Sequence, residues 1–154
     1  MSYRTWHEYG YGVCMDDIET TANKVFELVH LAPEFEKRFY KWIENYREDG
    51  DPESIAEFIT MDIIHEYEDD NCCEYGLGPI VMEVVKECED VELLSCSDFD
   101  GYHYLIFSTT YPWYMNDKEK NMTEEDVRLL FAKYVSILTN KVINVEYQSV
   151  ANGG

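Results

Sequence analysis

An Asp100-Gly101 pair separates two runs of β-branched and aromatic residues, at 91–99 and 102–110. Gly after Asp between two such runs is typical of the tight turn of a β-hairpin. Before residue 90 the apolar residues instead recur at helical spacing. The chain is therefore expected to be an α+β protein, with helices in its first half and a sheet formed mainly by its second half.

Three helices and a shorter fourth are predicted before the hairpin. The first is capped by Thr20 or Thr21 and stops near Pro33, which opens a second helix that ends at Gly50. A third restarts at 51–53 and continues to about Tyr67, and an apolar fourth runs from Pro79 through Glu87. Their apolar stripes contain Val25, Leu28, Val29 and Ala32; Phe35, Phe39, Trp42, Ile43 and Tyr46; Ile55, Ile59, Ile63 and Tyr67; and Ile80, Val84 and Val85.

After the hairpin, Thr123 and Asp126 have the spacing of a capping box and predict one more helix. A last strand is expected at 142–150, and 151–154 are expected to form a frayed tail. Residues 1–14 are expected to form an aromatic N-terminal arm, either extended or a short strand that ends in turns. The predicted order is ααα(α)ββαβ: three or four N-terminal helices packed on a small, three-stranded, mainly antiparallel sheet in a single domain over 1–154. The side chains expected to form much of the core are Phe35, Phe39, Trp42, Ile43, Leu130, Phe131 and Tyr134.

The net charge of −20 is concentrated in the middle of the chain. Residues 1–47 carry 8 acidic and 6 basic residues, residues 48–117 carry 19 acidic residues and the single base Lys86, and residues 118–154 carry 5 of each. Such a block repels nucleic acids and anionic membranes and attracts basic surfaces. The expected partner is therefore a basic protein surface, and direct binding to nucleic acid or to a membrane is not expected.

Composition also predicts the compartment. The start of the chain has neither the basic residues nor the apolar stretch of a signal peptide, and five cysteines without CxxC spacing fit free thiols in a reducing compartment. A cytoplasmic protein is expected.

The acidic block predicts a partner-binding site at Asp62, Glu66, Asp69, Asp70 and Glu74. The first three are spaced i, i+4, i+7, which would place them on one stripe of the third helix, while the other two belong to the loop that follows. Carboxylates so arranged resemble the phosphates of a nucleic-acid strand in spacing. The alternative is a solvated acidic face that serves solubility alone.

Trp113 and Tyr114 are a second predicted contact, because they lie in a loop with Tyr111 and Met115. Trp, Tyr and Met are enriched at the cores of protein interfaces. The alternative is that Trp113 plugs the end of the core.

No motif predicts catalysis, a cofactor or a metal. The segment 65–74 contains His, Cys, Asp and Glu without the spacing of a zinc or calcium site, and no nucleotide-binding or hydrolase motif is present. The leading hypothesis is a non-enzymatic inhibitor that imitates nucleic acid in the basic groove of a nucleic-acid-binding enzyme, for example a phage or mobile-element inhibitor of a CRISPR effector or restriction nuclease. The alternatives are a housekeeping or regulatory acidic binding protein and a small enzyme with an unrecognised site.

Overall fold

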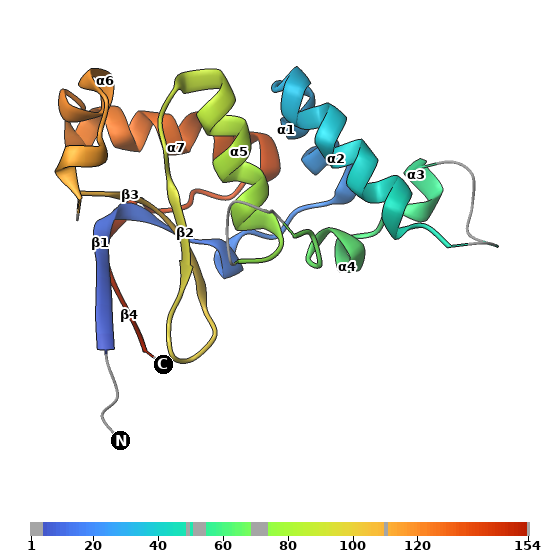
Figure 1. Cartoon of the computed structure of the whole chain (residues 1–154), viewed down its shortest axis with the longest axis horizontal. Helices are drawn as coiled ribbons and strands as arrows, with labels where there is room; N and C mark the ends of the chain where they lie inside the picture. Colours follow the sequence, from blue (N-terminus) through green and yellow to red (C-terminus); the bar gives the residue numbers. More distant parts are fainter. Residues whose placement is uncertain (1–4, 49, 51–54, 69–73, 110, 154) are drawn as a thin grey trace.

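The computed structural model describes residues 5–48, 50, 55–68, 74–109 and 111–153. It confirms the α+β class, with helices gathered to one side of an antiparallel sheet (Figure 1). In chain order the elements are β1 (Thr5–Cys14), η1 (Met15–Asp17), α1 (Ala22–His30), α2 (Pro33–Tyr46), α3 (Ile55–Phe58), α4 (Met61–Ile64), α5 (Leu77–Glu89), β2 (Leu94–Ser97), β3 (His103–Ser108), η2 (Pro112–Tyr114), α6 (Asp117–Lys120), α7 (Glu124–Leu138) and β4 (Glu146–Gly153).

The sheet has four strands in the order β2-β3-β1-β4, whereas three were predicted. The extra strand is β1, which lies within the segment predicted to be an N-terminal arm. It pairs antiparallel with β3 on one side and with β4 on the other. The predicted frayed tail is also wrong for 151–153, because this segment belongs to β4 and pairs with 5–7. The backbone N–H and C=O groups of 5–7 and of 151–153 are therefore paired with each other across the sheet.

Two glycines let the backbones of β1 and β3 approach closely at the centre of a curled sheet. A Cβ at Gly12 would lie 2.1 Å from the carbonyl oxygen of Leu105, and one at Gly10 would lie 2.0 Å from that of Phe107. The outer strands β2 and β4 contact each other across the curl. Ile106 lies on the opposite face of the sheet from Leu105, and both side chains are fully buried.

The hairpin between β2 and β3 follows the predicted turn. Gly101 has φ +85°, and the carboxylate of Asp98 accepts the backbone N–H groups of Asp100 and Tyr102, both at 2.9 Å. This is the geometry of a three-residue hairpin loop with a left-handed glycine. The strands are shorter than the predicted runs, because residues 91–93 and 109 lie outside the ladder.

The core lies between the helices and the sheet and confirms the predicted side chains. Phe35, Phe39, Ile43, Leu130, Phe131 and Tyr134 are buried, and Trp42 is partly buried against them. Helix α7 contacts β1, α5 contacts β2 and β3, and α1 and α2 extend the helical layer away from the sheet (Figure 1). Thr21 caps α1, and Thr123 and Asp126 form the predicted capping box of α7.

The predicted third helix is broken into two short helices, α3 and α4. The acidic site that was predicted on a single helix therefore has to be revised. The backbone at Thr60 is extended (φ −115°, ψ 168°), which separates α3 from α4. Helix α4 ends at Ile64, and the chain then turns so that Gly76 donates its N–H to the carbonyl of Tyr67 at 2.9 Å. Thr favours the extended conformation before a helix, and the break allows Phe58, Ile59, Ile64 and Tyr67 all to be buried.

Several acidic residues of the central block have structural roles along α5. The Glu87 carboxylate accepts the N–H groups of Glu34 and Phe35, at 3.1 and 2.8 Å, and so caps the start of α2. Glu83 is buried and pairs with Arg38 at 3.0 Å. Glu89 accepts hydrogen bonds from Lys133 at 2.8 Å and Tyr134 at 2.7 Å. These three carboxylates link α5 to α2 and α7. Their hydrogen bonds and ion pairs are made within the protein.

Replacing Glu89 by glutamine is expected to lower the free energy of unfolding by about 1–3 kcal/mol at pH 7, because it removes charge-assisted hydrogen bonds. The bonds from Lys133 and Tyr134 hold the pKa of Glu89 below its usual range. The contribution of a carboxylate with a lowered pKa is complete above its unfolded-state pKa and is lost as the pH falls through the folded-state value. Urea unfolding followed by circular dichroism should therefore show a smaller difference between wild type and variant at pH 3 than at pH 7.

The matched control is Glu125→Gln, which removes an exposed carboxylate from the first turn of α7 and should change stability by less than about 0.5 kcal/mol. An equal difference between wild type and Glu89→Gln at both pH values would contradict the assigned role of Glu89.

Candidate interaction surface

The structure brings together only part of the predicted acidic site. Asp62 lies exposed in the first turn of α4, and Glu66 is exposed just after that helix. Glu74 lies at the far end of the following loop and accepts a hydrogen bond from the Ser97 hydroxyl at 3.0 Å. Asp69 and Asp70 lie outside the described residues. Asp62 and Glu66 do not share a helical stripe, because α4 ends at Ile64.

Glu66 instead belongs to a surface pocket of about 420 Å³, here called the aromatic-acidic pocket. The Tyr46 hydroxyl, at the end of α2, donates a hydrogen bond to the Glu66 carboxylate. Glu68 and Tyr75 form a β-bridge that closes the loop on the opposite side. The pocket is lined by Trp42, Tyr46, His65, Glu66, Glu68 and Tyr75.

The aromatic wall of this pocket is fixed by the core. Trp42 stacks on Tyr46 with ring centroids 5.2 Å apart and meets the buried Tyr67 edge-on at the same distance. Behind them, Phe39 contacts Tyr67 at 5.5 Å. The pocket thus combines rings anchored in the core with carboxylates at the surface, and none of its described lining residues is a lysine or an arginine.

Further carboxylates gather at the end of the hairpin, which we call the acidic end: Asp16, Glu74 and Asp98. Asp16, in η1, accepts the backbone N–H of His103 at 2.6 Å, and Asp98 accepts the Tyr104 hydroxyl at 3.5 Å. The pKa of Tyr104 is raised, mainly by its partial burial and to a smaller extent by the nearby charges of Cys14 and Asp98. The negative charge here comes from three segments far apart in sequence, so sequence spacing could not reveal it.

The loop that contains Trp113 and Tyr114 is exposed, so Trp113 does not plug the core. Trp113 is 69% and Tyr114 78% exposed. Their rings meet each other and that of Tyr111, with centroids 5.6–6.1 Å apart. The alternative of a buried Trp113 is therefore wrong, while a contact with a partner through these rings remains a prediction.

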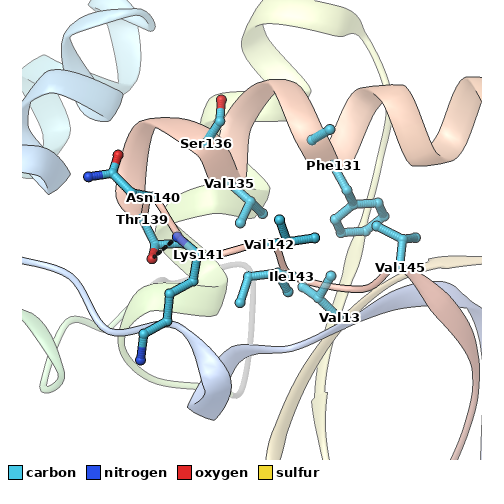
Figure 2. A pocket seen from close by; sticks show the side chains of 11 residues that line it. Val13, Phe131, Val135, Ser136, Thr139, Asn140, Lys141, Val142, Ile143 and Val145 are labelled. Atoms are coloured by element: carbon cyan, nitrogen blue, oxygen red, sulfur yellow. Dashed lines mark hydrogen bonds between the residues drawn. The ribbon is translucent and has the colours of Figure 1, made fainter.

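An apolar hollow of about 390 Å³ lies between the second half of α7 and the segment 139–145 (Figure 2). Val13, Phe131, Val135 and Val145 point into it in this view. Lys141, at its rim, pairs with Glu19 at 3.2 Å. No carboxylate is among the described residues that line this hollow, so these residues offer no counter-ion to a cationic group.

The described residues contain no group of three or more His, Cys, Asp or Glu side chains that could hold a metal ion. Cys72 and Cys73, in the segment considered for metal binding, lie outside the described residues. The thiols of Cys14 and Cys88 have their pKa raised, in each case first by burial, and this lowers the fraction of reactive thiolate. His30 and His103 face the carboxylates of Glu36 and Asp16.

Glu68 and Tyr75 were not identified as site residues from the sequence, and Trp42 was not placed at the wall of a pocket. Trp42 and Tyr46 were assigned to the core stripe of α2, but one edge of that stripe faces the pocket. The bridge between Glu68 and Tyr75 joins the two sides of a loop, and no local pattern signals it. The alternation of Tyr and Glu at 66–68 was the only local hint.

Comparisons with protein-family models, with curated proteins and with solved structures gave no match. Within the described part of the chain, no helix has the length and apolar character needed to cross a membrane.

Proposed function

We propose that this chain is a non-enzymatic protein that binds a basic protein surface, with the aromatic-acidic pocket as its central contact. The observation that carries the proposal is the pairing of an aromatic wall, Trp42, Tyr46 and Tyr75, with the carboxylates of Glu66 and Glu68 in one pocket. An arginine can stack its guanidinium on such rings and pair with a carboxylate at the same time. A surface that served solubility alone would not need exposed rings beside its charges.

The distribution of ion pairs supports the same proposal. Seven lysines and arginines of the described chain, including Arg38, Lys118 and Lys133, already pair with carboxylates. Because the internal pairs use most of the positive charge, the exposed acidic residues dominate the field at the surface. Such a field accelerates encounter with a basic partner and weakens as salt is added.

The finer proposal is inhibition by mimicry of nucleic acid. Glu66 and Glu68, together with Asp16 and Asp98 at the acidic end, present carboxylates from separate segments, as a curved basic groove for phosphates would require. CRISPR effectors and restriction nucleases, the targets of phage inhibitors, have grooves of this kind. A regulatory acidic binding protein that contacts a basic surface outside any nucleic-acid groove is the second candidate, and the exposed Tyr75 favours it equally.

The expected result of a capture experiment is mutual exclusion. The chain, immobilised on beads, should retain a purified CRISPR effector or restriction nuclease at 50 mM salt, and retain at least tenfold less at 500 mM. Saturating duplex DNA or guide RNA should displace the nuclease, because both ligands occupy the same groove.

The chain itself should give no mobility shift with DNA or RNA. Simultaneous binding of nucleic acid and this chain by one nuclease would contradict mimicry and favour the regulatory alternative. If neither CRISPR effectors nor restriction nucleases are retained at 50 mM salt, the proposal of a nuclease target is contradicted.

A further inference from the structure

A third pocket, of about 370 Å³, is lined in part by the aromatic loop that precedes α6. In Figure 1, α6 lies at one end of the molecule and α4 lies toward the other. We propose that this pocket binds the guanidinium group of a single arginine side chain, with Glu8 as its counter-ion. The site goes beyond the proposed function, because it shares no residue with the aromatic-acidic pocket. Its lining residues are Glu8, Glu92, Leu93, Leu94, Ser108, Tyr111, Tyr114, Met115 and Glu119.

Glu8 carries the argument. It lies on β1 opposite Val150, on the concave face of the curled sheet, where Val150 is buried. One carboxylate oxygen of Glu8, Oε2, is buried and accepts no hydrogen bond from the described residues. Leaving a buried carboxylate oxygen without a donor is costly, and such groups are rare in folded proteins. Glu8 thus borders the pocket as a carboxylate without a counter-ion among the described residues, and a cation bound in the pocket compensates its charge.

The surroundings select a cation of a particular kind. Glu92 adds a second carboxylate, while Leu93, Leu94 and Met115 provide an apolar wall. Rings line the side formed by the loop, where Tyr111 and Tyr114 meet at 64° with centroids 6.1 Å apart. A guanidinium is planar and weakly hydrated, so it stacks on rings and enters a partly apolar pocket more readily than an ammonium group. The apolar wall suits the methylene stem of the arginine.

The pocket is held open by a rigid frame. The buried carboxylate of Glu119 accepts the backbone N–H of Glu92 at 2.9 Å and that of Asn116 at 2.9 Å. Asn116 in turn donates its side-chain amide to the carbonyl of Asp90 at 2.8 Å. The loop with the rings is thereby fixed to the segment between α5 and β2. Glu119 has its hydrogen bonds within the protein, which leaves Glu8 and Glu92 for the ligand.

Titration of the ¹⁵N-labelled chain with the blocked tripeptide Gly-Arg-Gly is expected to give saturable NMR shifts at 92–94 and 111–115. Binding should weaken in the order arginine, lysine, citrulline, since citrulline keeps the shape of arginine without its charge. Glu8→Gln should weaken arginine binding about tenfold, the loss expected for a hydrogen bond to a charged group. Tyr114→Ala should weaken it about threefold through loss of the ring contact, and Tyr102→Ala, an exposed tyrosine of the hairpin, should leave it unchanged.

Thermal unfolding distinguishes a binding role of Glu8 from a structural one. Because Glu8→Gln removes an unpaired, partly buried charge, the variant is expected to melt about 2–5 °C higher than wild type. Weaker binding together with higher stability is the signature of a residue kept for a ligand. The proposal is overturned if citrulline binds as well as arginine, if Glu8→Gln binds as wild type does, or if no saturable shift occurs at 92–94 and 111–115.

Discussion

Replacing Phe39 by alanine is expected to lower the free energy of unfolding by about 3–5 kcal/mol, the usual cost of removing a large ring from a core. Phe39 is fully buried, and its ring contacts those of Phe26, Phe35 and Trp42 with centroids 5.9–6.4 Å apart. These neighbours come from α1 and α2, and the buried Tyr67 adds a further ring contact at 5.5 Å, so the truncation removes packing on several sides at once. Urea unfolding followed by tryptophan fluorescence and circular dichroism measures the change.

Phe99→Ala is the matched control, because Phe99 is 62% exposed at the tip of the hairpin. Its loss should change the free energy of unfolding by less than about 0.5 kcal/mol. The same truncation therefore has two very different expected outcomes, decided by burial alone. A loss below about 1 kcal/mol for Phe39→Ala would mean that the helical layer is not packed as described here.

The helical half of the fold was predictable where one apolar stripe met one strong terminal signal. Pro33 with the stripe of Phe35, Phe39 and Ile43 gave α2, and Thr123 with Asp126 gave the capping box of α7. The prediction of one continuous third helix was wrong, because isoleucines spaced four residues apart fit one long helix as well as two short ones. The break at Thr60 depends on how Phe58 and Ile64 reach the core, which is a tertiary effect.

The pairing of the two ends of the chain was not predictable from local pattern. Residues 5–14 contain two glycines, which are unfavourable in strands, so this segment was interpreted as an extended arm or a short strand and was not counted in the sheet. Those glycines are what allows β1 to approach β3 closely at the centre of the sheet. Likewise, the pairing of 151–153 with 5–7 joins residues from opposite ends of the chain, which no sequence window contains.

The acidic composition was predictable, but the division of labour among the acidic residues was not. Glu83, Glu87 and Glu89 lie on one helix with similar surroundings in sequence, yet Glu83 pairs with a side chain of α2, Glu87 caps the start of α2, and Glu89 bonds to α7. Glu66 was correctly singled out, although for a helical stripe that does not exist. Its place beside Tyr46 follows from the meeting of α2 with the turn after α4. Contacts between such distant segments can be recognised only from the three-dimensional structure.

The double reversal Glu66→Lys with Glu68→Lys tests most directly whether this chain binds a basic surface through the aromatic-acidic pocket. The measurement is the dissociation constant, by calorimetry at 50 mM salt, for the nuclease retained in the capture experiment. Glu27→Lys with Glu125→Lys is the matched control, because it makes the same change in net charge at exposed positions on α1 and α7, outside every pocket described here. The pocket reversal is expected to cost about 2–5 kcal/mol of binding free energy, since it removes attractive pairs and adds repulsion, while the control should cost less than about 1 kcal/mol. Equal losses for the two variants, or wild-type affinity for the pocket reversal, would contradict binding through this pocket.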